Sequence, residues 1–116
     1  MNIGIHDKNF MSMVPKMANR HGLIIGATGT GKTVTLKVLA EQFSQLGIPV
    51  FMQDVKGDLT GFIEPGSESP RFRERLDLIG LDKVDFTTYP TTFWDIFGKE
   101  GHPVRTTVSD MGTLML

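Results

Sequence analysis

The stretch Gly26-Ala27-Thr28-Gly29-Thr30-Gly31-Lys32-Thr33 decides the fold, because it matches the pattern G-x-x-x-x-G-K-S/T at every fixed position. It follows the apolar run Leu23-Ile24-Ile25 and precedes a helical pattern. A loop that wraps a phosphate points consecutive backbone N–H groups inward, and glycine tolerates the required dihedral angles best. The stretch therefore predicts a phosphate-binding P-loop between a buried strand and a helix.

The predicted nucleotide-binding residues are Gly26, Ala27, Thr28, Gly29, Thr30, Gly31, Lys32, Thr33 and Val34. The helix after the loop directs its positive dipole end and free N–H groups at the anion. Lys32 is a predicted catalytic residue because its ammonium reaches the β- and γ-phosphates, and the Thr33 hydroxyl is the predicted ligand of Mg²⁺. No guanine-reading N/T-K-x-D motif is present in the sequence, which favours ATP.

The residues around the loop predict a βαβ unit. Apolar residues recur at spacings of three and four after Lys32, which predicts a helix ended by Gly47. Residues 48–52 form a second apolar run that ends near Asp54 and predicts a strand. The connection between the two strands should be right-handed.

Further elements are predicted on both sides of this unit. Short edge strands are expected within the first twenty residues, and Ser69 and Pro70 should cap a helix that Gly80 ends. The remaining predictions are strands over 84–88, 92–97 and 104–108, and a last helix that begins near Ser109-Asp110.

Asp54 is the second candidate catalytic residue. It begins the segment Asp54-Val55-Lys56-Gly57-Asp58 at the carboxyl end of the second strand, where open α/β sheets bind ligands. A carboxylate there can hold a magnesium water or orient the attacking water. For Asp54, a role at the magnesium site and a role in an ordinary turn are equally favoured. For Asp58, the turn is favoured.

Weaker candidates have two interpretations each. A polar lead-in is favoured over a base or ribose contact for residues 19–21, and a solvated helix face over a DNA or partner surface for Arg71, Arg73 and Arg75. Trp94 fits a core better than a base-stacking platform. The roles of His102 and Arg105 stay open between a nucleotide contact and a loop.

Composition fits one soluble globular domain over residues 1–116. Hydrophobic residues make up 40% of the chain, charged residues 22%, and the formal net charge is −1, so no overall basic character indicates nucleic acid. The absence of cysteine, of a signal-peptide pattern and of a membrane-spanning apolar run predicts a cytoplasmic protein with no membrane partner.

The chain is short for a complete P-loop ATPase, which needs about two hundred residues. After Asp58 no run of four apolar residues ends in Asp or Glu, although a hydrolysing P-loop enzyme uses such a second acidic residue. We therefore expect a truncated domain, and whether this chain hydrolyses ATP stays open.

Linked segments resemble HerA-like P-loop ATPases, including a bacterial group described as putative ATPases or helicases. They are the P-loop with residues 15–22 before it and Thr33-Val34-Thr35-Leu36 after it, then residues 49–51, 54–59 and 101–107. The chain resembles the N-terminal part of that family. The resemblance implies an α/β fold, a RecA-like three-layer sandwich with a mainly parallel sheet that is incomplete here. It also implies an ATP hydrolase that moves double-stranded DNA, as a hexameric ring, in the full-length protein.

Three functions follow as hypotheses. The first is the ATP-binding domain of a HerA-like DNA-processing motor. The second is a small P-loop kinase with residues 71–75 as a lid, and the third is a nucleotide-binding module without turnover.

Overall fold

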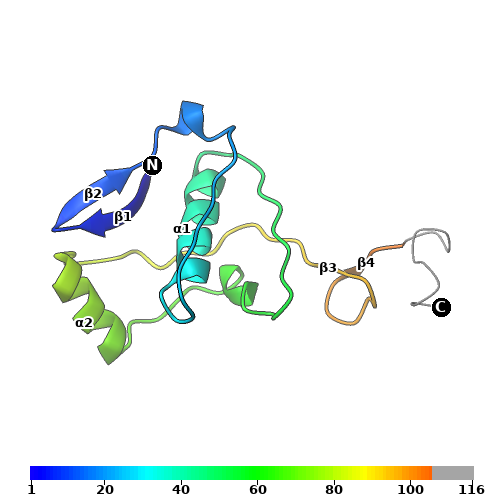
Figure 1. Ribbon diagram of the computed structural model, residues 1–116. Helices are drawn as coiled ribbons and strands as arrows, with labels where there is room; N and C mark the ends of the chain where they lie inside the picture. Colours follow the sequence, from blue (N-terminus) through cyan, green and yellow to red (C-terminus); the bar gives the residue numbers. More distant parts are fainter. Residues whose placement is uncertain (106–116) are drawn as a thin grey trace.

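The computed structural model describes residues 1–105, in which a central helix is surrounded by smaller elements (Figure 1). The chain begins with β1 (Asn2–His6) and β2 (Asn9–Ser12), two short strands of the kind predicted within the first twenty residues, and they pair as an antiparallel hairpin. Asp7 and Lys8 turn it with positive φ angles of 48° and 62°. This is the backbone twist that two-residue hairpin turns use. β1 packs against the central helix α1 (Lys32–Gln45).

Helix α1 confirms the predicted helix at both ends. It begins after Gly31, whose φ is 94°, and Gly47 follows its last turn with a φ of 72°. The N–H of Ile48 donates to Phe43 O at 2.9 Å and that of Gly47 to Ser44 O at 2.9 Å. This pair of bonds is the Schellman motif, which explains why the helix stops at the glycine.

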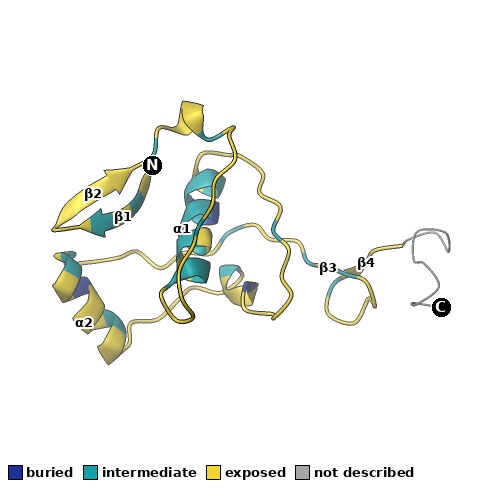
Figure 2. Ribbon diagram, in the orientation of Figure 1, coloured by how far each residue is buried: buried dark blue, intermediate teal, exposed yellow. Residues whose placement is uncertain are grey.

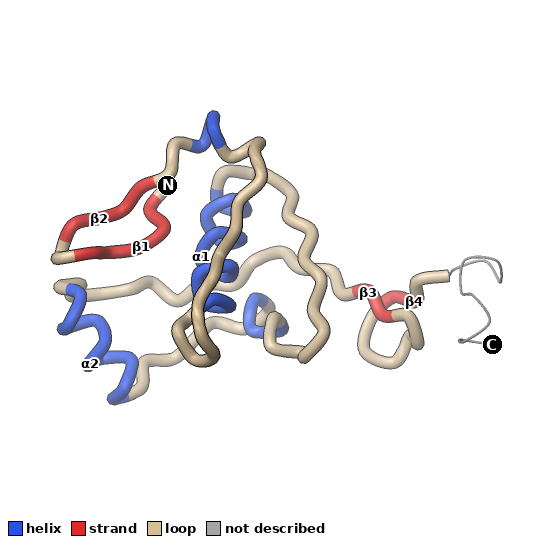
Figure 3. Tube along the Cα trace, viewed as in Figure 1, coloured by secondary structure: helices blue, strands red, loops and turns tan. Residues whose placement is uncertain are grey.

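Helix α2 (Pro70–Ile79) also lies where its capping residues predicted it. Ser69 Oγ accepts a hydrogen bond from the N–H of Phe72 at 3.2 Å, and Pro70 occupies the first helical position. Gly80 ends the helix with a φ of 74°. Leu76 is the buried residue of this helix, with 3% exposure. Two short 3₁₀ helices, η1 (Pro15–Met17) and η2 (Thr60–Phe62), complete the helical elements of the described residues (Figure 3).

The predicted strands differ most from the structure. Within residues 1–105, the second sheet is the parallel pair β3 (Trp94–Asp95) and β4 (His102–Pro103). β3 covers two residues of the strand predicted over 92–97, and β4 was not predicted. Segments 23–25, 48–52 and 84–88 form no strand, because none of them pairs with another segment among residues 1–105. The predicted strand over 104–108 lies partly, and the last predicted helix wholly, outside the described residues.

The apolar core is small and lies around α1 and α2 (Figure 2). Among the described residues the buried apolar side chains are those of Ala40, Leu59 and Leu76. Tyr89 links its own segment to η2 and α1. Its N–H donates to Phe62 O, and its hydroxyl accepts from Gln45 Nε2, both at 2.9 Å. The radius of gyration is 17.4 Å, above the roughly 13 Å of a compact chain of about this length.

Candidate functional site

The predicted P-loop is an exposed turn that leads directly into α1. Gly29 and Gly31 have φ angles of 81° and 94°, which side chains rarely adopt. Gly26 is needed for a different reason, because a Cβ there would lie 2.5 Å from Thr30 Oγ1. Gly29 and Gly31 thus allow left-handed backbone in this loop, and Gly26 allows a close approach to Thr30.

Lys32 folds back over this loop. Its Nζ donates to Gly26 O at 2.9 Å and to Ala27 O at 2.7 Å, while Thr30 Oγ1 donates to Ala27 O at 2.8 Å. The ammonium is therefore at the mouth of the loop, where the sequence predicted it, and is held by the loop's own carbonyl oxygens. An ammonium has three donors, so a phosphate oxygen can take the third, or replace a carbonyl.

The start of α1 offers backbone donors to an anion. The first backbone bond into the helix runs from the N–H of Thr35 to Gly31 O at 2.9 Å. Among the described residues, no acceptor bonds the N–H groups of Lys32, Thr33 or Val34, and the first turn contains no acidic side chain. These donors suit the oxygens of a triphosphate. Thr33 lies in the same turn, which fits its predicted role at Mg²⁺.

Asp54 organises the loop that follows it. Its Oδ1 accepts from the N–H groups of Lys56 at 3.1 Å and Gly57 at 2.8 Å, and its Oδ2 accepts from Leu59 N–H at 2.9 Å. These backbone hydrogen bonds, chiefly the one from Leu59, lower the pKa of Asp54. The carboxylate is thus ionised at neutral pH and already engaged by three donors.

The loop after Asp54 lies next to α1. Leu59 is buried, and the position that a Cβ would take on Gly61 is 3.9 Å from Lys37 Nζ. Lys37 stands four residues after Thr33, so the two side chains share one face of the helix. Figure 1 shows η2 beside the first half of α1. The loop after Asp54 therefore approaches α1 at the Lys37 side chain.

Asp95 is a second acidic residue with this construction, and sequence reasoning missed it. Its carboxylate accepts from the N–H groups of Phe97 at 3.0 Å, Lys99 at 2.7 Å and Glu100 at 3.2 Å. These bonds, with the one from Phe97 first, lower the pKa of Asp95. Asp54–Gly57 and Asp95–Gly98 share the spacing D-x-x-G, but the sequence also has this spacing at Asp58–Gly61 and Asp77–Gly80, so it could not have identified Asp95 by itself. Gly57 and Gly98 have positive φ angles, of 73° and 63°.

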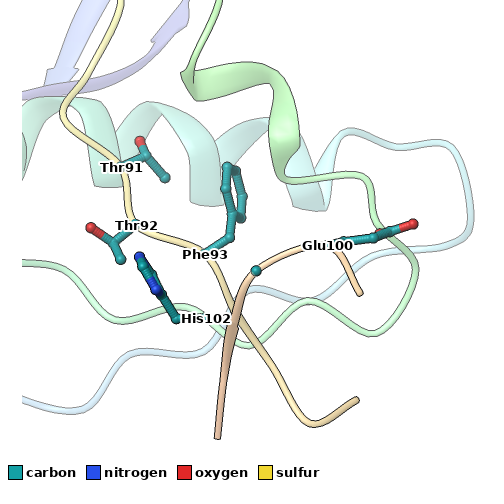
Figure 4. Close-up of a pocket in the computed structure, with 6 residues that line it drawn as sticks. Thr91, Thr92, Phe93, Glu100 and His102 are labelled. Atoms are coloured by element: carbon teal, nitrogen blue, oxygen red, sulfur yellow. The ribbon is translucent and has the colours of Figure 1, made fainter. Parts of the chain in front are cut away.

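The Asp95 loop borders a shallow hollow of about 430 Å³ (Figure 4). The hollow is lined by Thr91, Thr92, Phe93, Glu100, Gly101 and His102. Gly101 permits the close approach of the two segments, because a Cβ there would lie 2.7 Å from Phe93 O. His102 packs on Trp94 with ring centroids 5.6 Å apart. No P-loop residue lines this hollow, so the structure does not join His102 to the predicted nucleotide site.

The remaining candidates lie apart from the P-loop. Arg73 contacts α2 and the residues on either side of it, with Nη1 donating to Asp82 O at 2.9 Å and ion pairs to Glu68 and Asp77. Arg71 and Arg75 line a second shallow hollow on α2. Residues 19–21 and Arg105 are exposed and make no side-chain hydrogen bond within the described part of the chain.

Residues 1–105 contain neither a metal-binding cluster nor a membrane-spanning helix. No group of three metal-ligating side chains is found there. No helix there has the length and apolar character needed to cross a membrane.

Comparison with known proteins gives one family. The model described as "Helicase HerA-like C-terminal" matches residues 3–116, nearly the whole chain. No curated protein and no solved structure is similar enough to the chain to match it.

Proposed function

This chain belongs to the helicase HerA-like C-terminal family, and from that premise we propose that it is an ATP-binding P-loop domain. In the proposal the backbone from Gly26 to Val34 holds the triphosphate together with Mg²⁺. The HerA-like resemblance of the segments around the loop, together with the family match, supports the RecA-like sandwich as the fold of the complete domain.

One observation carries the proposal. Three consecutive N–H groups, of Lys32, Thr33 and Val34, have no acceptor among the described residues and follow a loop whose glycines adopt positive φ. An exposed helix terminus of this kind, without an acidic side chain in its first turn, fits an external anion. The matching Lys-Thr pair narrows that anion to a nucleoside triphosphate.

Each residue has a defined task in this proposal. Lys32 would donate to the β- and γ-phosphates in place of one or both carbonyl oxygens, and Thr33 Oγ1 would hold the magnesium ion. When bound, the metal would supply positive charge that offsets the charge on the phosphates. The loop glycines let the main chain approach the phosphates closely.

In a longer HerA-like protein we propose that this domain drives the movement of double-stranded DNA within a homo-oligomer, a hexamer by family resemblance, in the cytoplasm. A nucleotide-binding module without turnover is the second candidate. It is favoured by the engagement of Asp54, whose carboxylate is already occupied by three backbone donors.

Lys32→Ala tests the assignment. We expect it to weaken ATP binding at least about a hundredfold, because two or more charge-assisted hydrogen bonds to phosphate are lost, each contributing about 1.5–3 kcal/mol. Isothermal titration of the wild-type chain and the variant with ATP and Mg²⁺ measures this. Lys37→Ala, on the same helix, is the matched control and should change the affinity little.

The same proteins separate the functions. DNA-stimulated ATP hydrolysis supports the motor, and binding without hydrolysis supports the module. ADP formation that depends on a small acceptor supports a kinase instead. Unaltered ATP affinity in Lys32→Ala contradicts the assignment of the P-loop itself.

A further inference from the structure

We propose that β3, β4 and the loop between them form a stacking surface for unpaired nucleic-acid bases, with Trp94 and Phe97 as the rings on which the bases stack. These residues, 93–104, are called the aromatic arm. The inference rests on the proposed function only in taking nucleic acid as the partner, and ATP has no part in it.

The two rings of the arm are open to solvent. The sequence favoured a core position for Trp94, whereas this residue is 64% exposed and Phe97 is 74% exposed. Ile96, which stands between them in the chain, is exposed as well. Figure 1 shows β3 and β4 apart from α1 and α2. Neighbouring large apolar side chains that stay exposed mark a surface that binds something.

Hydrogen bonds hold the arm in one shape. The N–H of His102 donates to Phe93 O at 2.9 Å. The N–H of Val104 donates to Asp95 O, also at 2.9 Å, so two backbone bonds close the base of the arm. The carboxylate of Asp95 then accepts three backbone N–H groups of the loop, including that of Phe97. A surface that is already ordered loses less conformational entropy when it binds a ligand.

Each ring has a neighbour that suits a nucleotide. His102 packs on Trp94 with ring centroids 5.6 Å apart and an angle of 50° between the ring planes. Lys99 Nζ lies 6.0 Å from the centroid of Phe97. His102 also lines the hollow of the arm together with Thr92 (Figure 4). An imidazole and a hydroxyl there can exchange hydrogen bonds with the edge of a base that stacks on the arm.

The charge of the arm favours bases over the phosphate backbone. Within residues 93–104 the cationic side chain is Lys99, and it is opposed by Asp95 and Glu100. Binding to the outside of a duplex draws on several cations that contact phosphates, which this arm lacks. The aromatic rings must therefore provide the attraction. They can stack on the faces of bases only where the bases are unpaired.

The fluorescence of Trp94 tests the inference directly, because Trp94 is the only tryptophan of the chain. The wild-type chain without ATP is titrated with single-stranded oligothymidylate, with the duplex that this strand forms with oligoadenylate, and with inorganic polyphosphate. We expect the single strand to quench the emission. The duplex and polyphosphate should quench it little, since the first hides its base faces and the second has none.

Affinities for a labelled single strand, measured by fluorescence anisotropy, test the two rings. We expect Trp94→Ala and Phe97→Ala each to weaken binding about tenfold, the effect of losing one stacked base. Trp94→Phe keeps a ring and should retain most of the affinity. Phe51→Ala is the matched control, because Phe51 is an exposed aromatic residue outside the arm, and it should bind as the wild type does.

Four results overturn the inference. They are no quenching by the single strand, equal affinities for strand and duplex, equal losses in Trp94→Ala and Phe51→Ala, and an emission that changes with protein concentration alone. The last result would assign the rings to contact with a second copy of the chain.

The proposed nucleotide site is tested separately with ATP. Quenching of Trp94 by ATP that Lys32→Ala abolishes would place the rings at the nucleotide site and overturn the separate role of the arm. If the wild-type chain binds no ATP, the proposed function fails, and the strand titration still decides the role of the arm.

Discussion

At the scale of single residues, the glycines and acids of this chain act through the backbone. Gly31 and Gly29 allow left-handed turns in the P-loop, and Gly57 and Gly98 allow the chain to wrap around an aspartate. The P-loop motif fixes Gly31, whereas Gly29 stands at one of its variable positions and was singled out because glycine tolerates the dihedral angles of such a loop. Sequence reasoning did not identify Asp95, because this residue falls within the strand predicted over 92–97 and its D-x-x-G spacing recurs elsewhere in the sequence.

Gly31→Ala is the residue-scale prediction. Gly31 has a φ of 94° and no atom within 4 Å of a Cβ built there, so the cost of alanine comes from the backbone alone. We expect at least about tenfold weaker ATP binding, since forcing an alanine into left-handed backbone costs about 1–2 kcal/mol. Gly22→Ala is the control, because Gly22 has equal room and an ordinary φ. Equal affinities of the two variants would contradict this account of the loop.

At the scale of elements, the helices were predictable and the strands were not. Helix ends are set by neighbours in sequence, such as Ser69 and Gly80 around α2 or Gly47 after α1. A strand is defined by a partner that lies far along the chain or outside it. The runs at 23–25 and 48–52 have the composition of strands, yet the described residues contain no segment that pairs with them.

The N-cap of α2 provides the element-scale prediction. Ser69→Ala removes the acceptor for the N–H of Phe72 and should lower the free energy of unfolding by about 1 kcal/mol. Ser67→Ala is the matched control, because Ser67 makes no side-chain hydrogen bond among the described residues. Urea denaturation of both variants followed by circular dichroism measures the difference. A loss of equal size in both variants would show that the cap does not stabilise α2.

At the scale of the whole molecule, much apolar surface stays uncovered. Leu23, Ile25 and Phe51, all from segments predicted as buried strands, are 84%, 80% and 90% exposed. The three buried apolar residues lie on α1's and α2's packed faces and at Leu59, so these segments contribute nothing to the core of the described residues. The composition predicted one globular domain, and the RecA-like sandwich stays a prediction.

The whole molecule should respond to acid through its two aspartate-built loops. The pKa of Asp54 and that of Asp95 are both lowered, so each contributes stability that is present above the unfolded-state pKa of about 3.9 and is lost as pH falls through the lower folded-state value. We expect the amides of Leu59 and Glu100 to lose protection together below that pH. Side-chain carboxyl NMR titration checks both midpoints, with the urea-unfolded chain as the control. Midpoints at the ordinary aspartate value would contradict the prediction.

The two hydrogen bonds between Lys32 and the carbonyls of Gly26 and Ala27 make nucleotide binding an exchange rather than an addition. A phosphate that takes Nζ returns those carbonyls to water, which offsets part of the attraction between ammonium and triphosphate. Until then, the carbonyl oxygens of Gly26 and Ala27 occupy the acceptor positions at Nζ that phosphate oxygens would take.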